Sequence, residues 1–212
     1  MTTPKDLLAQ YQKRKPEIKK RLREFEAVWK MPGKRIFAEL CFCICTPQSK
    51  AVLCDEAISA LSSSGLLYHG SLKEIRKGLM KVRFPNNKAR FILEARKLFF
   101  GKSAVKIKKA VDTGDIKGTR HWLSRTVKGI GLKEASHFLR NIGFGEDLAI
   151  LDVHILKKMA RLKVIRAIPK SICEKHYFAM EEKLRKFSKK IDIPMAELDL
   201  LFWSAETGFV FK

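Results

Sequence analysis

Hydrophobic side chains recur at helical spacing along most of the chain. In residues 132–142, for example, the apolar positions Leu132, Ala135, Leu139 and Ile142 are separated by three, four and three residues, which places them on one helix face. Strand-like alternation is scarce, and glycine and proline fall between the periodic segments. The pattern predicts an all-α protein. We expect helices over residues 5–29, 33–45, 49–63, 71–81, 86–100, 103–112, 118–127, 132–142, 153–162, 170–189 and 194–207.

One segment, residues 127–154, joins a glycine turn to a polar helix face and an aspartate. The turn contains Gly129 and Gly131, and glycine lets the main chain approach a ligand closely. The helix that follows is expected to present free N–H groups to an anion, with Lys133 on its polar face. Asp152 stands where a helix N-cap is typical. Each feature alone is commoner as a plain turn, a solvated lysine or a cap, so only the combination indicates a site.

The charge balance indicates a polyanionic partner. The chain has 212 residues, with 44 Lys and Arg against 22 Asp and Glu, and a formal net charge of +22. Positive charges in such excess repel one another in the folded protein. Binding to the phosphates of a nucleic acid neutralises them and relieves this repulsion. No segment approaches the roughly 18 consecutive apolar residues of a membrane span, and the first ten residues lack an apolar signal core. We expect residues 1–212 to form one unit and to have no membrane partner. We expect the protein to be cytoplasmic, and to be associated with the nucleoid if its source is prokaryotic.

The sequence VKGIGLK, followed by LDVH, resembles the helix-hairpin-helix and Gly/Pro-Asp motif of base-excision DNA glycosylases. Three further segments resemble the archaeal-type 8-oxoguanine DNA glycosylase/AP lyases: ELCFCICTPQSKA at 39–51, RFPNNKARFI at 83–92 and LDLLFWSAETGFVFK at 198–212. The final lysine matches the end of that family. Lys128 departs from it by replacing the usual hairpin proline. The resemblance implies a helix-hairpin-helix fold of two helical lobes, an active site in the cleft between them and a monomer, with the hairpin and catalytic segment at about 118–162.

The cysteines bear on whether a cofactor is present, because many proteins with this hairpin carry an iron–sulfur cluster near the C-terminus. Such a cluster needs four closely spaced thiolates, and only Cys173 follows the hairpin. The spacing in CFCIC is wrong for a zinc knuckle, and an odd count argues against a disulfide framework. We therefore expect no cofactor, and buried, reduced core thiols at Cys41, Cys43, Cys45, Cys54 and Cys173.

The resemblance also implies a catalytic pair, Lys133 and Asp152. Lys133 would attack the sugar C1′ as a neutral amine, and Asp152 would stabilise the positive charge that develops as the glycosidic bond breaks. A Schiff base between Lys133 and C1′ would then allow β-elimination at the abasic site. No metal is required for this chemistry. The expected partner is double-stranded DNA that contains 8-oxoguanine or abasic sites.

A base inside a duplex must be flipped out before it can be excised. We expect Trp203 to stack on the flipped base, with His137 as the opposite face of the pocket. Phe84 would fill the gap in the duplex or stack in the pocket. The terminal carboxylate of Lys212 would accept a hydrogen bond from N7–H of 8-oxoguanine, where guanine has a lone pair. Asp199, one turn from Trp203, would hold the Lys212 ammonium.

Contacts to DNA are implied around the hairpin and two further segments. Residues 48–50 resemble the loop that enters the duplex, and the polar residues of 86–90 would hold phosphates and the strand opposite the lesion. The expected residues are Gly129, Gly131, Gln48, Ser49, Lys50, Asn86, Asn87, Lys88 and Arg90. By resemblance, a monovalent cation would bridge the main-chain carbonyls of Arg125, Val127 and Ile130 to a phosphate. The segment 163–190 is expected to be a solvated or DNA-skirting amphipathic helix.

Two other functions remain open from the residues alone. The first is an enzyme of the same mechanism that removes an oxidised pyrimidine. The second is a non-catalytic module that uses the hairpin only for contact with the DNA backbone, in which Lys133 and Asp152 would be idle. A panel of damaged substrates distinguishes the first, and activity itself distinguishes the second.

Overall fold

The computed structural model describes residues 4–100 and 106–212, and these residues form helices without a β-strand. The predicted all-α class is confirmed. The helices are α1 (Pro4–Lys30), α2 (Gly33–Cys45), α3 (Ala51–Ser63), α4 (Leu66–His69), α5 (Leu72–Gly78), α6 (Pro85–Phe99), α7 (Ile116–Thr126), α8 (Leu132–Asn141), α9 (Val153–Arg161), α10 (Glu174–Ile191) and α11 (Met195–Thr207), with one 3₁₀ turn, η1 (Ile107–Ala110).

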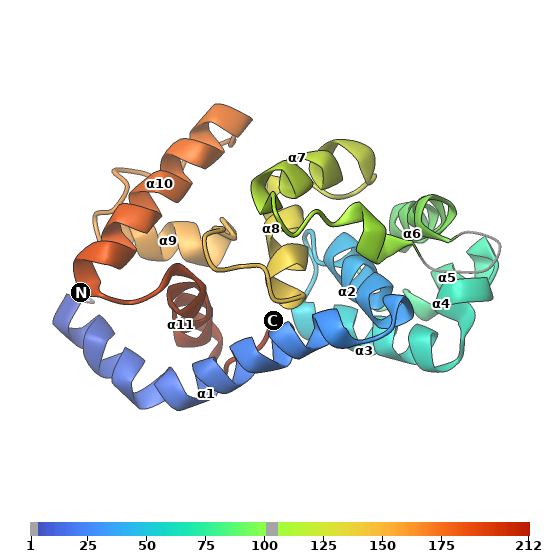
Figure 1. The fold of residues 1–212 in the computed structure, drawn as a ribbon, viewed down its shortest axis with the longest axis horizontal. Helices are drawn as coiled ribbons and strands as arrows, with labels where there is room; N and C mark the ends of the chain where they lie inside the picture. Colours follow the sequence, from blue (N-terminus) through green and yellow to red (C-terminus); the bar gives the residue numbers. More distant parts are fainter. Residues whose placement is uncertain (1–3, 101–105) are drawn as a thin grey trace.

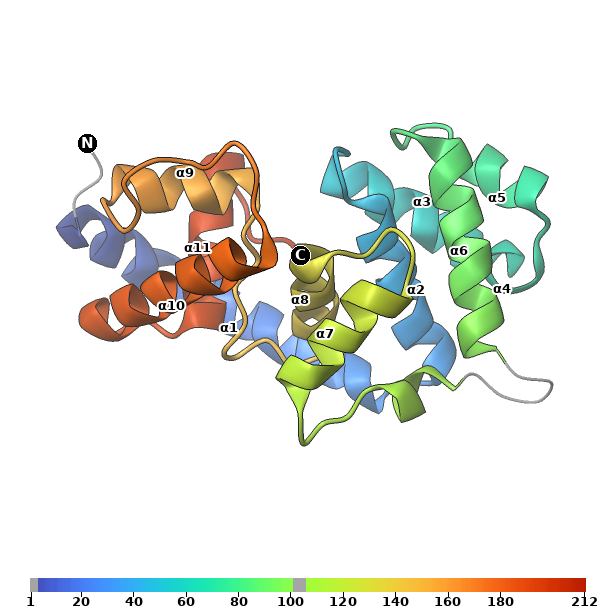
Figure 2. The same cartoon turned by 90° about the horizontal axis from the view of Figure 1, so that it is seen from above.

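Two hydrophobic cores divide these helices into two lobes (Figure 1). The hairpin lobe, α2 to α8, is built around fully buried aromatic rings such as Phe37, Phe42 and Phe138. The terminal lobe combines α9, α10 and α11 with most of α1, and it buries Leu7 and Phe202 completely. The view in Figure 2 shows the C-terminus between the two lobes. The expected two-lobe architecture is therefore present.

Helix α1 joins the lobes by running along both of them (Figure 1). Leu7, Tyr11 and Ile18 are buried in the terminal lobe at spacings of four and seven, and Val28 reaches the core of the hairpin lobe. The helix continues through Pro16, a residue that lacks the N–H donor and bends helices. Its curved course follows the outline of both lobes.

Several of the expected helices are shorter than predicted, and α5, for example, covers only residues 72–78 of the expected 71–81. The helix expected over 103–112 is only the 3₁₀ turn η1, and residues 103–105 of that prediction lie outside the described residues. The helix expected from residue 170 begins at Glu174, after an irregular segment in which Lys163 has a positive φ of 58°. Residues 170–173 are not helical, although proline at position 169 would be tolerated at the start of a helix. The short helix α4 was not predicted, because four residues are too few to show a helical period.

The cysteines of α2 and α3 follow the prediction, and Cys173 does not. Cys41, Cys43, Cys45 and Cys54 are buried free thiols, whereas Cys173 is exposed at the N-terminus of α10. Burial raises the pKa of the Cys54 thiol to about 11, which keeps it protonated at neutral pH. The prediction that all five pack in the core was therefore wrong for Cys173, which precedes a helix rather than lying on an apolar face.

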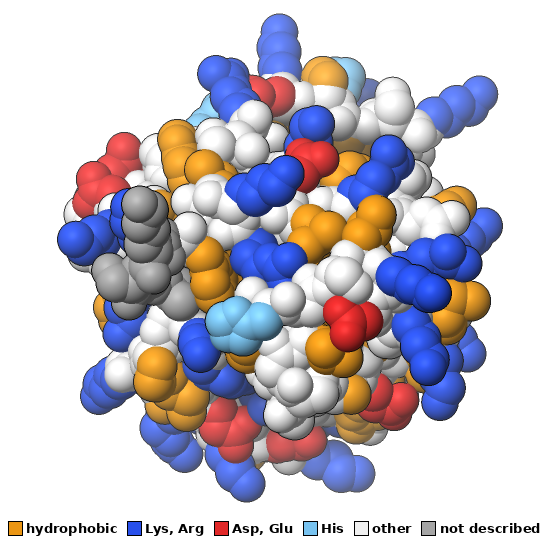
Figure 3. Space-filling view, turned by 90° about the vertical axis from the view of Figure 1, so that its right-hand side faces the viewer, with side chains coloured by type: hydrophobic (Ala, Val, Ile, Leu, Met, Phe, Trp, Pro, Cys, Tyr) orange, Lys and Arg blue, Asp and Glu red, His pale blue; other side chains and the backbone are white. Residues whose placement is uncertain are grey.

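Positive charge is spread over the face shown in Figure 3 without forming a single patch. Lys and Arg side chains are scattered across the end of the molecule that carries α4 to α6 (Figure 3). Within the described ranges, no helix combines the length and the apolar character needed to cross a bilayer. Among the same residues, no group of three or more His, Cys, Asp or Glu side chains is arranged to hold a metal ion.

Candidate active site

A cleft of about 950 Å³ opens between the two lobes. One wall is the α2–α3 loop and α8, and the other is the segment before α9, helix α11 and the tail after it, residues 208–212. Residues far apart in the sequence meet there, as expected for a site between lobes. The predicted residues that line the cleft are Gln48, Ser49, Lys50, Lys133, His137, Asp152, Asp199, Trp203 and Lys212.

The glycine turn between α7 and α8 has the geometry that the sequence indicated. Gly129 has a φ of 83°, and a Cβ atom at this position would lie 2.6 Å from the ring of Phe91. Both observations require glycine. The N–H of Gly131 donates to the Glu134 carboxylate at 3.2 Å, which caps the first turn of α8. The turn thus leads directly into the helix that carries Lys133.

Lys133 is the second residue of α8, and its side chain, 24% exposed, lines the cleft. Its Nζ atom lies 3.2 Å from Oε1 of Glu134, so the amine must leave this carboxylate before it can attack another group. Lys128, before the turn, is 3.3 Å from Glu94 and does not line the cleft. The structure therefore places Lys133 at the cleft and Lys128 outside it.

Asp152 is the N-cap of α9, as predicted. Its Oδ1 atom accepts a hydrogen bond from the N–H of Ile155 at 2.8 Å. The residue lines the cleft from the wall opposite α8. A cap of this kind contributes about 1 kcal/mol to stability and also fixes the direction of the carboxylate.

The backbone just before Asp152 is held by buried side chains of α10. Glu181 accepts the N–H of Ala149 at 2.8 Å, and the hydroxyl of Tyr177 donates to the carbonyl of Ala149 at 2.6 Å. Arg120 of α7 donates to both oxygens of Glu181, at 2.6 and 3.0 Å. A charge-assisted, bidentate pair of this kind is strong and directional. It ties the Asp152 segment to the lobe that carries Lys133.

This arrangement corrects the prediction for residues 163–190. Only part of that segment is helical, and α10 is not simply a solvated surface helix, because it buries Tyr177, Met180, Glu181 and Leu184. Because charged residues are frequent throughout this segment, its sequence did not indicate that Glu181 is the acidic residue that the fold buries. Arg120, also buried, gave no signal in the sequence, since a single arginine on a helix is usually exposed.

The wall formed by α11 and the tail is aromatic. The ring of Trp203 stacks on Phe211, with centroids 5.9 Å apart, and meets Phe209 edge-on at 5.4 Å. Phe209 lines the cleft with 43% of its surface exposed, although the sequence did not single it out. The alternation of aromatic residues in the tail sequence GFVF was the available signal. Exposed rings in a cleft provide surfaces on which a base can stack.

His137 forms part of the opposite wall, and its ring makes an edge contact with Phe42 at 5.5 Å. Burial lowers the pKa of His137 well below its usual value, and the positive charges of Arg140 and Lys133 lower it further. A main-chain contact from Lys212 acts in the opposite direction without reversing the shift. The ring is therefore neutral at pH 7 and offers a face without a charge.

The predicted pairing of Asp199 with Lys212 was wrong. Asp199 of α11 lies 3.5 Å from the guanidinium of Arg140 of α8, and both residues line the cleft. The Nζ atom of Lys212 lies 3.0 Å from Glu39 and 2.5 Å from Asp55, on helices of the hairpin lobe. Burial raises the pKa of Asp199 to about 6, although Arg140 acts in the opposite direction.

Lys88 does not face solvent as a phosphate ligand would. The residue is 4% exposed, and its ammonium donates to the carbonyls of Cys45 and Pro47 and to Oγ of Ser49, at 2.6, 2.9 and 2.8 Å. All three donors are thus used to hold the α2–α3 loop. Gln48, at the tip of that loop, is exposed and has a positive φ of 55°. The predicted phosphate contact of Lys88 is corrected to a structural contact with the loop.

The other predicted residues of α6 lie outside the cleft. Asn86, Asn87 and Arg90 are exposed in the first turns of the helix, and Arg90 donates to Asn87 at 2.6 Å. Phe84 is 47% exposed, has a φ of 58°, and lies 5.2 Å from the Arg83 guanidinium. Because Phe84 does not line the cleft, stacking in the pocket is disfavoured, and filling a gap in the duplex stays a prediction.

The proposed cation position at the hairpin also stays a prediction. The carbonyl of Val127 accepts the N–H of Ile130 at 3.2 Å, so one of its two lone pairs is already engaged. The side chain of Arg125 is exposed and lies 3.7 Å from Glu174. The expected absence of an iron–sulfur cluster likewise stays a prediction.

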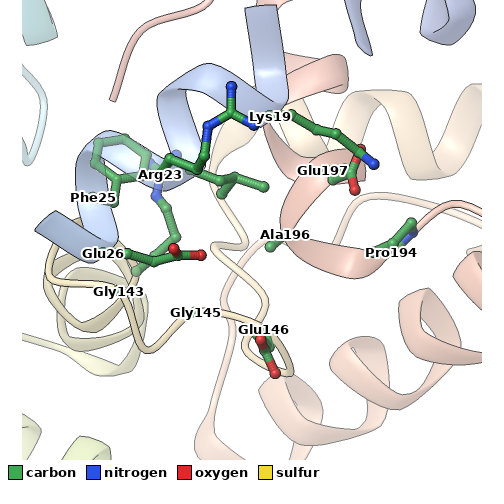
Figure 4. A pocket seen from close by; sticks show the side chains of 12 residues that line it. Lys19, Arg23, Phe25, Glu26, Gly143, Gly145, Glu146, Pro194, Ala196 and Glu197 are labelled. Atoms are coloured by element: carbon green, nitrogen blue, oxygen red, sulfur yellow. The ribbon is translucent and has the colours of Figure 1, made fainter. Parts of the chain in front are cut away.

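A second, smaller cavity of about 410 Å³ lies between α1, the loop after α8 and the start of α11 (Figure 4). Both acidic and basic side chains line it, including Lys19, Arg23, Glu26 and Glu197. Their charges largely balance, so the cavity has no marked preference for an anion or a cation. None of the predicted site residues lines it. The cleft between the lobes is therefore the candidate active site.

Comparison with known proteins identifies the family. A family model described as 8-oxoguanine DNA glycosylase matches residues 18–193. The chain belongs to this family. It is 42% identical, over 95% of its length and 94% of the relative, to the 8-oxoguanine DNA glycosylase/AP lyase of Fusobacterium nucleatum. It is 36% identical to the protein of the same name from Korarchaeum cryptofilum, over 92% of this chain and 90% of that protein.

Solved structures of this 8-oxoguanine DNA glycosylase family share the fold. The crystal structure of the Thermotoga maritima enzyme matches with a TM-score of 0.88 and 37% identity, covering 99% of this chain and 98% of the other. The Methanocaldococcus jannaschii enzyme, in complex with a 15mer DNA containing 8-oxoguanine, matches with a TM-score of 0.87 and 32% identity, covering 97% and 99%. The predicted family and its helix-hairpin-helix fold are thus confirmed.

Proposed function

We propose that this protein is a bifunctional DNA repair glycosylase that excises 8-oxoguanine and cleaves the resulting abasic site by β-elimination. The observation that carries the proposal is the meeting of Lys133, directly behind the glycine turn, and Asp152 in one cleft. Relatives named 8-oxoguanine DNA glycosylase/AP lyase match over nearly the whole chain and support both activities. The DNA-bound relative supports a damaged duplex as the partner.

The chemistry that we propose starts with the amine of Lys133. Once it has lost a proton and left Glu134, it attacks C1′ while the bond from C1′ to the base breaks, and the base leaves with the bonding electrons. Asp152 stabilises the positive charge that the sugar develops in this step. The sugar ring then opens to an imine on Lys133. Loss of a C2′ proton expels the 3′ phosphate and cleaves the strand.

For recognition of the base, we propose that the flipped base enters between Trp203 and His137. Stacking on an aromatic ring contributes about 1–3 kcal/mol per base, which offsets much of the cost of flipping. The neutral His137 ring suits an uncharged base. We assign to the carboxylate of Lys212 the acceptor that meets N7–H, since this residue lines the cleft together with Trp203 and His137.

The duplex would lie across the mouth of the cleft. The N–H groups of the glycine turn and the first turn of α8 suit one phosphate. The exposed Gln48 and Lys50 of the α2–α3 loop, with Asn86 and Arg90 of α6, would contact the strands nearby. The net charge of +22 supplies the long-range attraction. A monomer that acts in the cytoplasm or nucleoid stays our expectation.

The test is borohydride trapping on an 8-oxoguanine duplex. We expect the unaltered protein to form a covalent complex, and Lys133→Gln to lose trapping and to slow base release by about 10³-fold or more, with duplex binding retained. Lys128→Gln, outside the cleft, is the matched control and should behave like the unaltered protein. Base release by Lys133→Gln at the normal rate would refute the mechanism. Faster excision of an oxidised pyrimidine than of 8-oxoguanine would refute the assigned substrate.

A further inference from the structure

Two carboxylates from neighbouring helices converge on the ammonium of Lys212. Its Nζ atom lies 3.0 Å from Oε1 of Glu39 on α2 and 2.5 Å from Oδ1 of Asp55 on α3. The ring of Phe42, with its centroid 4.6 Å from Nζ, closes a third side. We call Glu39, Asp55 and Phe42 the carboxylate cage. The lysine side chain is only 11% exposed, which is unusual for a lysine.

The cage is negatively charged with the lysine in it. Glu39 is 2% exposed and also lies 2.6 Å from Arg35, and it accepts a hydrogen bond from Asn141 at 3.1 Å. Burial alone would raise the pKa of Glu39, but the charges of Lys212 and Arg35 outweigh it and the net shift is downward. Glu39 is therefore ionised at neutral pH, and a buried carboxylate needs cations beside it.

The rest of the tail belongs to the other lobe. Arg14 of α1 donates to the carbonyl of Gly208 at 2.9 Å, and Arg21 donates to that of Phe211 at 3.1 Å. Both contacts fasten the tail backbone to α1. The side chain of Lys212 instead crosses to α2 and α3, so the last residue connects the tail to the hairpin lobe at the edge of the cleft.

We propose that the carboxylate cage is a positioning device for base recognition. By holding the Lys212 ammonium, Glu39 and Asp55 fix the end of the tail against the cleft, and so determine the preference for 8-oxoguanine without acting on the sugar. The inference rests on the proposed function. An unanchored terminal segment samples many positions, and an error of about 1 Å in a recognition group can cost on the order of 100-fold in rate.

Removing one charge from the cage should not destabilise the fold strongly, because the cage borders a hollow that water can enter. A hollow of about 320 Å³ lies behind it, and polar side chains such as Arg35, Ser59 and Ser62 line this hollow. Water can therefore hydrate a carboxylate that has lost its cation, or an amide that replaces a carboxylate. We expect cage variants to fold, which makes the inference testable by activity.

The experiment compares Glu39→Gln and Asp55→Asn with the control Glu56→Gln, an exposed carboxylate next to Asp55 on α3. Two rates are measured under single-turnover conditions: release of 8-oxoguanine, and cleavage of a duplex with a preformed abasic site. We expect both cage variants to slow base release by about 10- to 100-fold and to leave abasic-site cleavage within about twofold. Glu56→Gln should match the unaltered protein in both assays, and Asp55→Glu should restore most of the base release.

Lys212→Gln approaches the same contact from the other side, since it removes the ammonium and keeps the main chain. It should slow base release as much as Glu39→Gln does. The double variant, with both Glu39→Gln and Lys212→Gln, should release the base no more slowly than either single variant, because all three variants lack the same interaction. If the two losses multiplied instead, the cage would not act through Lys212 and the inference would be wrong.

Two further outcomes would overturn the inference. Equal loss of both rates with a lowered Tm would show that the cage only stabilises the fold, and normal base release in every variant would show that it positions nothing. In both cases the unaltered protein excises 8-oxoguanine and the proposed function stands. An unaltered protein that cleaves abasic sites but leaves 8-oxoguanine in place would instead refute the proposed function, and the inference with it.

Discussion

On the proposed catalytic side of the cleft, the segment that carries Asp152 is fixed through the buried pair of Arg120 and Glu181. On the proposed recognition side, a lysine ammonium holds the α2–α3 loop and another ties the end of the tail to the hairpin lobe, while two arginines of α1 hold the rest of the tail backbone. Lys88 inserts into the loop, and Lys212 inserts into the carboxylate cage. The contacts that tie irregular backbone to the hairpin lobe thus use a guanidinium on the first side and ammonium groups on the second.

The difference matters because the two cations differ in rigidity. A guanidinium is planar and binds a carboxylate through two parallel hydrogen bonds, so it fixes both distance and orientation. An ammonium is a compact, strongly hydrated charge on a flexible stem. The catalytic side therefore has a fixed geometry that is costly to break, and the recognition side has contacts that can change with a smaller loss of stability. Three predictions test this comparison, in addition to the two experiments above.

The largest effect on stability is expected for Arg120→Met. It removes the cation from a carboxylate that is buried with it, and breaking such a pair costs about 3–5 kcal/mol of unfolding free energy. Arg125→Met on the same helix removes a cation that is 71% exposed and should cost less than about 1 kcal/mol. Denaturant unfolding measures both. Equal losses in the two variants would contradict the assigned importance of the Arg120–Glu181 pair.

A smaller loss is expected for Lys88→Met, which leaves the carbonyls of Cys45 and Pro47 without their donor. We expect the unfolding free energy to fall by about 2 kcal/mol, with weaker duplex binding because the loop that carries Gln48 loses its anchor. The salt dependence of duplex affinity distinguishes this role from a phosphate contact. If Lys88 held a phosphate, stability would be unchanged and the log–log salt slope would decrease by about 1.

The smallest effect concerns pH and the pair of Arg140 and Asp199, where the two walls meet. Asp199 has a pKa of about 6 in the folded protein against a usual 3.8, so the folded state takes up a proton that the unfolded state takes up only at lower pH. Its contribution to stability is full below pH 3.8 and is lost as the pH rises through 6. Between pH 8 and pH 5, the unaltered protein should gain about 1 kcal/mol relative to Asp199→Asn. Thermal melts of both proteins across this range measure the difference, and parallel curves would contradict the shifted pKa.

Local features of the site were predictable from the sequence because short-range geometry determines them. The helical period placed Lys133 on the face of α8 that lines the cleft, and Asp152 at the cap of α9. The glycine at position 129 follows from the sharp turn that must precede α8. The roles of the other polar residues were less predictable. Lys88 and Cys173 were assigned from their residue type, and the packing of their neighbours decided otherwise.

The sequence by itself thus determined most of the helices, the glycine turn and the N-cap at Asp152, since each depends on residues a few positions apart. Only the tertiary structure decided which charges meet. Glu39 lies 173 positions before Lys212, and Glu181 lies 61 positions after Arg120. A chain with 44 basic and 22 acidic residues allows many such pairings with similar Coulomb energy. The packing of the helices buries a few of them, and burial in a low dielectric makes those few strong.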